Sequence, residues 1–255
     1  MNYLTGAATD IGIEKRTNQD SVMIKIGEKD NEYIGFAMVC DGMGGLSKGE
    51  LASAHVITAF SDWFDNTLVQ MLSGENRWKL IRESWNQLIL QLNDKLFTYG
   101  KSKGTNLGTT ITGVITIEGH YLIVNVGDSR TYLLNDTISQ ITEDQSFVAR
   151  EVKLGRMTWE EAEYDTRRNV LLQCVGATGS VEAEFYEGEV HSGDTFLLCS
   201  DGFRHEVTPE EILTVLNPGE FRSEQDIELK ITELIELNKS RNENDNITAA
   251  IIKLV

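Results

Sequence analysis

Proline, cysteine and long apolar runs are all scarce in this sequence, and each scarcity excludes a class of protein. Only two prolines occur in 255 residues, and no Pro- or Ser-rich stretch marks a linker, so we expect one domain over residues 1–255. No apolar run approaches the roughly 20 residues that a transmembrane helix needs. The N-terminal stretch MNYLTGAATD lacks the basic and then apolar pattern of a secretory signal. We therefore expect neither a secreted nor a membrane protein.

The three cysteines form no CxxC motif, and an odd number cannot all pair with one another. Cys40 and Cys199 lie in apolar, strand-like runs, where a free thiol behaves as a small buried hydrophobe. Free thiols fit a reducing compartment. These features predict a cytoplasmic protein.

Positive charge is also scarce. The chain has 23 Lys and Arg residues against 40 Asp and Glu residues, which gives a net charge of −17. The absence of a basic stripe or cluster argues against a nucleic-acid partner and against an anionic membrane surface. An acidic chain either exposes a solvated negative surface or collects carboxylates around cations, and composition alone leaves both open.

The hydrophobic pattern predicts strands and helices in separate blocks. Strands are expected at residues 21–26, 33–40, 109–117, 121–126, 131–134, 185–190, 195–200 and 247–254. Helices are expected at residues 49–72, 78–97, 147–154, 159–162, 170–175, 209–216 and 224–237. Because the blocks do not alternate as βαβα, the pattern favours an α+β fold with antiparallel or mixed sheets covered by helices.

Aspartates stand at the ends of several of these strands. Asp41 and Asp201 each follow an apolar run and precede a glycine, and Asp128 follows YLIVNVG. Asp245 opens the final strand, and Asp20 stands at the start of an early one. If the strands lie side by side, the carboxylates surround one point and must either protonate or find a cation. Oxygen donors suit Mg²⁺ and Mn²⁺, and two such ions about 3.5–4 Å apart can activate water for attack on phosphorus. A single Asp-Gly pair is more often an ordinary turn, and spacing alone leaves both interpretations open.

A series of motifs resembles the metal-dependent Ser/Thr protein phosphatases of the type 2C (PPM) family, in their compact bacterial form. In chain order the motifs are TDIGIEKRTNQDSV, VCDGMGG, LGTTITGVI, VNVGDSRTYLL, ITEDQS, LLQCVGA, LLCSDGF and DNITAAII. They extend from about Thr9 to Val255. The resemblance implies an αββα four-layer sandwich, in which two antiparallel sheets are flanked by helix pairs. It also implies a variable flap at about residues 145–175, a candidate for substrate selection.

The resemblance assigns metal ligands residue by residue. Asp41 matches the carboxylate that bridges two metal ions, and Gly42 matches a position that ligates through its backbone carbonyl. Asp201 and Asp245 match the other ligands of the core pair. Asp128 matches a residue that, together with Asp201, holds a third ion in many bacterial members.

Further residues are expected to support this centre. Asp20 resembles a carboxylate that acts near the metals through water or through the direct ligands. Asn246 accompanies Asp245 in the family's DN pair and is expected to contact water or phosphate. Thr109 supports the centre from a neighbouring strand, although a purely structural strand start is an equally good interpretation.

The sequence departs from the family pattern at three places. Lys15 stands where typical members have a phosphate-binding Arg, and Arg16 lies beside it, so either cation is a candidate for binding phosphate. Each is otherwise a solvated surface cation. Met43 replaces a His that is proposed as the general acid in eukaryotic members. Gln145 replaces another family His, with an expected structural role.

The activity implied by the resemblance is hydrolysis of phosphoserine and phosphothreonine by a metal-activated water. The centre would contain two core Mg²⁺ or Mn²⁺ ions and, as in many bacterial members, a third. The implied partners are phosphorylated proteins, including a Ser/Thr kinase whose action the enzyme reverses, and a monomer is expected.

Two alternatives remain open. One is a phosphatase-fold regulator that binds phosphoproteins without turnover, against which the full set Asp41, Asp201 and Asp245 counts. The other is a two-metal hydrolase of nucleotides or phosphodiesters, which the order of the motifs disfavours.

Overall fold

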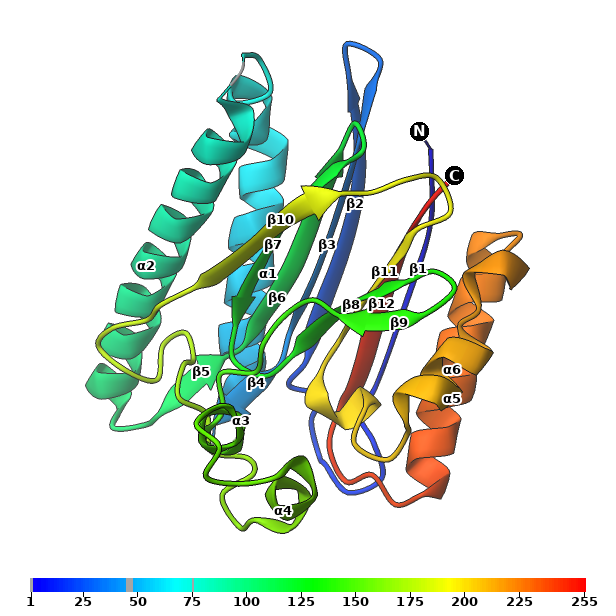
Figure 1. Cartoon of the computed structure of the whole chain (residues 1–255). Helices are drawn as coiled ribbons and strands as arrows, with labels where there is room; N and C mark the ends of the chain where they lie inside the picture. The colour runs from blue at the N-terminus through cyan, green and yellow to red at the C-terminus, as the bar shows by residue number, and fades with distance from the viewer. Residues whose placement is uncertain (1, 45–47, 75) are drawn as a thin grey trace.

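Two five-stranded antiparallel sheets form the centre of the molecule, and helices cover both outer faces (Figure 1). The structure is a computed structural model, and it describes residues 2–44, 48–74 and 76–255. The first sheet has the order β1 (Tyr3–Asp10), β12 (Ile247–Leu254), β11 (Thr195–Cys199), β8 (Arg130–Leu134) and β9 (Ile138–Gln140). The second has the order β10 (Glu184–Glu189), β7 (His120–Val126), β6 (Ile111–Ile117), β3 (Glu32–Cys40) and β2 (Ser21–Lys29).

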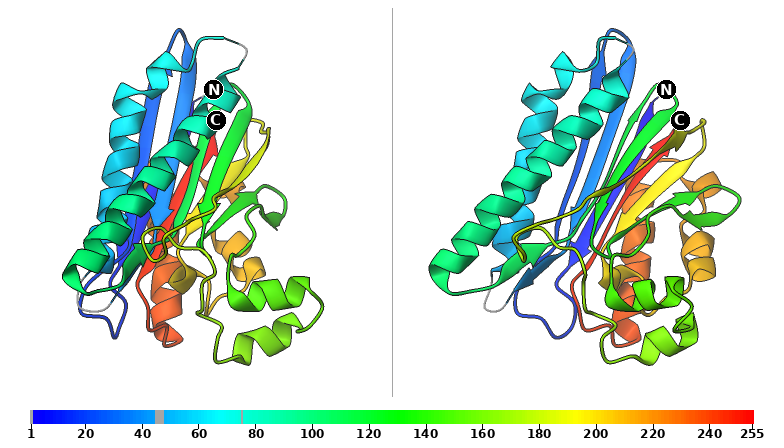
Figure 2. Two further views of the ribbon diagram at one scale, coloured as in Figure 1. Left: turned by 90° about the vertical axis from the view of Figure 1, so that its left-hand side faces the viewer. Right: turned by 60° about the vertical axis from the view of Figure 1, so that its left-hand side comes forward.

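Helix pairs form the two outer layers, as the side views in Figure 2 also show. The second sheet is covered by α1 (Gly49–Asn66) and α2 (Arg77–Lys103), and the first sheet by α5 (Pro209–Val215) and α6 (Glu224–Ser240). Two short strands, β4 (Gly42–Gly44) and β5 (Leu107–Thr109), pair with each other at one end. Two short helices, α3 (Phe147–Lys153) and α4 (Trp159–Tyr164), project from that end. The αββα sandwich predicted from the sequence is thereby confirmed.

The central strands are apolar on both faces because each sheet is buried on both sides. In β3, Phe36 and Met38 point to the layer of α1 and α2, whereas Ala37 and Val39 point to the opposite sheet. A strand that is buried on both sides needs a continuous apolar run and not an alternating pattern. This requirement explains the run YIGFAMVC, and it leaves the strand ends as places where polar residues can gather.

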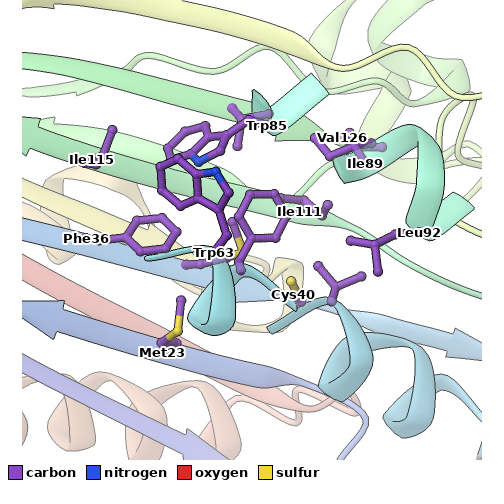
Figure 3. Close-up of a cluster of buried hydrophobic side chains, with 14 of the residues drawn as sticks. Met23, Phe36, Cys40, Trp63, Trp85, Ile89, Leu92, Ile111, Ile115 and Val126 are labelled. Carbon is purple, nitrogen blue, oxygen red and sulfur yellow. The ribbon is translucent and has the colours of Figure 1, made fainter. Parts of the chain in front are cut away.

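An aromatic cluster joins β3 to its two helices (Figure 3). The Phe36 ring lies 5.5 Å from Trp85 of α2 and 6.2 Å from Trp63 of α1, measured between ring centroids. The two tryptophans meet edge to face at 5.5 Å. All three side chains are almost completely buried. Trp63 and Trp85 therefore belong to the core.

Several sequence-based expectations differ from the structure. The helix predicted at residues 170–175 is wrong: this segment is extended, with bridges from Leu171 to Ser146 and from Val175 to Thr109. The helix predicted at residues 49–72 ends at Asn66 and is followed by a separate 3₁₀ turn, Leu68–Gln70. Strand β1 was not predicted, because YLTGAATD has little apolar pattern of its own. It forms by pairing along its whole length with β12.

The three cysteines are free and buried, as expected for Cys40 and Cys199. In the described ranges, none of the helices combines the length and the apolar character needed to cross a bilayer.

Replacing Phe36 by alanine should lower the free energy of unfolding by about 3–5 kcal/mol, since it removes a fully buried ring and leaves a cavity between β3 and two helices. Urea unfolding followed by tryptophan fluorescence and circular dichroism measures the change. Leu229→Ala is the control, because this side chain is 61% exposed and its loss should cost no more than about 0.5 kcal/mol. Equal losses in the two variants would contradict the assigned core.

Candidate metal centre

The predicted aspartates gather at one end of the sandwich, because antiparallel pairing places the end of one strand beside the start of another. In the second sheet, Ser21 pairs with Cys40, so Asp20 and Asp41 lie next to each other where β2 begins and β3 ends. This is the end from which α3 and α4 project (Figure 1).

The first sheet brings three more aspartates to the same end. Cys199 of β11 pairs with Arg130 of β8, so Asp201 and Asp128 flank the same pair of strand ends. Asp245 lies just before β12, the other neighbour of β11. Residues that are far apart in the sequence thus share one site, as the strand-end pattern predicts.

Burial and like charges both act on the Asp41 carboxylate. Burial raises the pKa of Asp41 well above its usual value, and the nearby carboxylates of Asp20, Asp201, Asp128 and Asp245 raise it further. Removal from water and like charges both disfavour the ionised form. A cation at this point would relieve both penalties.

Asp20 is in the same condition. Burial is the main cause that raises the pKa of Asp20, and the charges of Asp201 and Asp245 add to it. Hydrogen bonds from Thr248 and Ser200 partly offset the increase, and the resulting pKa is about 7. Within the described residues, Asp20 Oδ2 and Asp201 Oδ1 are buried without a hydrogen-bond partner. Such unpaired buried oxygens are rare unless a ligand, water or ion satisfies them.

The donor set fits divalent cations by its chemistry. Carboxylate oxygens are the ligands that Mg²⁺ and Mn²⁺ prefer. Over residues 2–44, 48–74 and 76–255, however, no three His, Cys, Asp or Glu side chains stand in the spacing of an assembled metal cage. The fit therefore depends on the convergence, burial and unsatisfied oxygens of the aspartates, and not on a preformed cage.

Two threonines hold the backbone of Asp41. The Asp41 N–H donates to Thr110 Oγ1 at 2.9 Å, and the Asp41 carbonyl accepts from the Thr110 N–H at 2.8 Å and from Thr109 Oγ1 at 2.9 Å. Thr110 is itself hydrogen-bonded to Ser129 at 2.7 Å. The sequence predicted a supporting role for the run Gly108-Thr109-Thr110, and in the structure Thr110 bonds to both the N–H and the carbonyl of Asp41.

The glycine after Asp41 is required by close backbone contact. A Cβ on Gly42 would lie 2.3 Å from the carbonyl oxygen of Gly49 and 2.5 Å from that of Gln19. Gly202, after Asp201, is similar, since its Cβ would lie 2.3 Å from the carbonyl oxygen of Asn246. Only glycine permits such an approach. Both Asp-Gly pairs therefore follow from packing at the site as well as from turn geometry.

The two candidate phosphate-binding cations differ in position. Lys15 Nζ lies 2.6 Å from Asp245 Oδ1. Burial lowers the pKa of Lys15, but the hydrogen bond to Asp245 and the charges of Asp245, Asp41 and Asp201 outweigh that effect and raise it. Arg16 is exposed and makes no ion pair within the described part of the chain.

Asn246 has partners other than the expected water or phosphate. Its side-chain oxygen accepts from the Gln19 N–H at 2.8 Å, and its amide donates to the carbonyls of Ile11 and Thr17 at 2.9 and 3.2 Å. Its side chain is buried. Asn246 therefore ties the loop that contains Lys15 to the strand that follows Asp245.

Asp128 lies in a buried network of charges that the sequence did not predict. Arg130 makes a two-pronged ion pair with Asp144, with both N–O distances at 2.8 Å. Arg204 Nη2 lies 3.5 Å from Asp144 Oδ2 and 4.0 Å from Asp128 Oδ2, and it donates to the Asp128 carbonyl at 3.1 Å. Burial and Asp201 raise the pKa of Asp128 to about 7, and Arg204 opposes this increase.

The imidazole of His205 faces Asp201. His205 Nε2 lies 3.6 Å from Asp201 Oδ2, and Nδ1 lies 3.2 Å from Glu243 Oε2. The other oxygen of Glu243 accepts from the N–H groups of Asn244 and Asp245 at 2.7 and 2.8 Å. Although burial lowers the pKa of His205, Glu243 and Asp201 outweigh it and the net direction is upward. His205 and Glu243 thus connect the Asp201 loop to the Asp245 loop.

Met43 and Gln145, which stand where the family has histidines, contact neighbouring groups of the protein. Met43 Sδ contacts Cys174 Sγ at 3.3 Å. Gln145 Oε1 accepts from the Gly127 N–H at 2.9 Å, next to Asp128. Gln145 therefore holds the backbone of the β7–β8 turn, in agreement with the structural role expected for it.

Arg204, Glu243 and Asp144 are the residues near the site that sequence reasoning missed. The sequence did offer one signal for Arg204: the pair Arg204-His205 directly follows the SDGF motif, in a chain with few basic residues. Their partners lie at remote sequence positions, and only the sheet register reveals them.

Comparisons with known proteins agree with this geometry. The family model described as Protein phosphatase 2C matches residues 13–248. A serine/threonine phosphatase stp of Listeria welshimeri is 32% identical over 248 residues, which are 96% of this chain and 93% of that protein. The serine/threonine protein phosphatase PstP of Mycobacterium tuberculosis is 32% identical over 98% of this chain, which spans 44% of PstP.

Solved structures show the same architecture. The S. agalactiae serine/threonine phosphatase superposes with a TM-score of 0.86 at 29% identity, and the match covers 100% of both chains. The catalytic domain of PstP in complex with 2 manganese ions gives a TM-score of 0.80 at 29% identity, over 99% of this chain and 98% of that one. Because the family model covers most of the sequence and the site lies where its motifs meet, this chain belongs to the protein phosphatase 2C family.

Proposed function

We propose that the protein is a metal-dependent phosphatase that hydrolyses phosphoserine and phosphothreonine in proteins. The observation that carries this proposal is the group of mutually repelling aspartates, buried or half-buried, at the strand ends of a protein phosphatase 2C chain. Relatives at 32% identity are named serine/threonine phosphatases, and one solved neighbour contains two manganese ions. We propose two core ions, Mg²⁺ or Mn²⁺, for this chain as well.

Asp41, Asp201 and Asp245 are the proposed carboxylate ligands of the core ions, with Asp41 as the bridge and the Gly42 carbonyl as a further ligand. Their proximity and the raised pKa of Asp41 support this assignment. The family resemblance matches Asp128, together with Asp201, to the position of a third ion in many bacterial members. The chemistry that bound Mg²⁺ or Mn²⁺ supplies is activation of a water and stabilisation of charge on the phosphoryl oxygens.

The surrounding residues have proposed roles in holding the ligands. Thr109 and Thr110 hold Asp41 by its backbone. Asp20 lies beside Asp201 and Asp245, where its buried, unpaired Oδ2 can bond to ordered water. Asn246 fixes the loop that contains Lys15. These contacts keep mutually repelling carboxylates in place, which a mobile loop would not do.

Lys15 is the proposed phosphate-binding cation. It is about half-exposed at the rim and already lies beside Asp245, so its ammonium can turn toward a phosphoryl oxygen without entering the core. Met43 offers no proton, so the departing serine or threonine oxygen takes its proton from water.

Substrate and cellular context follow from the same proposal. Residues 145–175, within a single domain of residues 1–255, are the proposed flap over the site and would contact the phosphoprotein. A Ser/Thr kinase would supply the substrates, and the enzyme would act as a monomer in the cytoplasm. The free thiols of Cys40, Cys174 and Cys199 fit that reducing compartment.

Asp41→Asn should lower kcat for p-nitrophenyl phosphate and for a phosphothreonine peptide more than about 100-fold, because losing even an indirect metal-site partner costs about 10–100-fold. The wild-type protein should be active with Mn²⁺ and inactive with chelator. Asp136→Asn, at an exposed turn position between β8 and β9, is the matched control and should keep full activity. Wild-type turnover that persists in chelator, or no turnover with Mn²⁺, would refute the proposed function.

Lys15→Gln should raise KM for the phosphothreonine peptide about 3–10-fold with a smaller change in kcat, the size expected for a half-exposed charged contact. Lys15→Arg should restore much of the affinity, because it keeps the charge. Arg16→Gln should change KM little. A KM increase in Arg16→Gln and none in Lys15→Gln would transfer the phosphate-binding role to Arg16.

A further inference from the structure

Two guanidinium groups and two carboxylates form a charge network around Asp128, and the carboxylate of Asp201 lies close to it. The buried network contains two guanidinium groups, Arg130 and Arg204, and two carboxylates, Asp144 and Asp128. Asp144 is shared by both arginines, and its two short bonds go to Arg130. Arg204 therefore shares Asp144 with Arg130, and the Asp128 carboxylate is the other negative charge next to it.

Arg204 is fixed in this position by its backbone as well as by its charge. Its N–H donates to the Asp201 carbonyl at 3.0 Å, in the 3₁₀ turn Asp201–Phe203. Its guanidinium donates to the carbonyl of Asp128, a residue 76 positions earlier, and lies 4.0 Å from the Asp128 carboxylate. The side chain is 13% exposed. A guanidinium stays protonated at all ordinary pH values, so this positive charge is permanent.

We propose that Arg204 is a built-in cation that takes the place of a third divalent ion at Asp128. This inference rests on the proposed function, because it concerns the metal content of the same centre. A divalent ion on Asp128 and Asp201 would come close to a guanidinium that cannot lose its charge, and it would leave the network with excess positive charge in a poorly solvated place. The centre of this chain therefore operates with two ions.

One further observation favours a role in the site over a role in stability. Arg204 Nε is buried and has no hydrogen-bond partner within the described residues. A buried charge that is incompletely paired is weak support for the folded state. The bonds that Arg204 does make, to the Asp128 carbonyl and to Asp144 Oδ2, place its charge beside Asp128.

The test is a titration of the metal-free protein with Mn²⁺, in which free Mn²⁺ is followed by electron paramagnetic resonance to count bound ions. Wild type and Arg204→Lys should bind two ions. Arg204→Gln should bind a third, at least about tenfold more tightly than any third ion in wild type, because the repelling charge is gone. Asp128→Asn combined with Arg204→Gln should return the count to two.

Controls separate this effect from general damage. Arg82→Gln changes the same residue type at an exposed position of α2 and should leave two ions. Circular dichroism shows whether each variant is folded. If Arg204→Gln does not fold, wild type is compared with Asp128→Asn instead. The proposal then expects the same Mn²⁺-binding isotherm for both proteins, because neither holds an ion at residue 128.

The proposal fails if wild type binds a third ion as tightly as Arg204→Gln, if folded Arg204→Gln binds only two, or if Asp128→Asn alone loses an ion. These results differ from a failure of the proposed function, which would appear as wild-type protein that binds no Mn²⁺ or shows no Mn²⁺-dependent hydrolysis.

Discussion

The mutual repulsion of buried carboxylates at one end of the sandwich is the constraint on which the rest of the site depends. Asp41 has other aspartates around it and little water, and its pKa rises accordingly. No folded chain keeps such a group without compensation. The neighbouring residues supply part of it: Thr109 and Thr110 fix the backbone, and Lys15 gives a positive charge at the rim.

The compensation is uneven across the site. On the side of Asp128 and Asp201, the guanidinium of Arg204 and the imidazole of His205 stand next to the carboxylates. On the side of Asp20 and Asp41, neither carboxylate forms an ion pair within residues 2–44, 48–74 and 76–255, Lys15 pairs with Asp245 at the rim, and Asp20 Oδ2 stays unpaired. External cations are therefore needed most on the second side. This asymmetry gives a physical reason for expecting fewer ions than a site made of carboxylates alone would attract.

The sandwich makes this concentration of charge possible. Strands such as β3 are apolar on both faces, so their middle parts supply the cohesion of the fold and hold the strand ends in a fixed register. Polar residues can collect at the ends without disturbing the core. Within the described ranges, the loops at this end also bring glycines 42 and 202 into close backbone contact, which fixes the positions of the aspartates before them.

The sequence by itself determined the strands that end in aspartate, the amphipathic helix near residues 78–97, and the family motifs in order. These are local features, because an apolar period or a motif is contained in a short stretch of chain. Strand β1 and the extended segment at residues 170–175 escaped prediction, since each takes its conformation from a partner strand far along the chain. The pairing of Arg204 with Asp128 was also decided by tertiary structure alone. Two residues 76 positions apart meet only because the register of β8 against β11 brings their strand ends together.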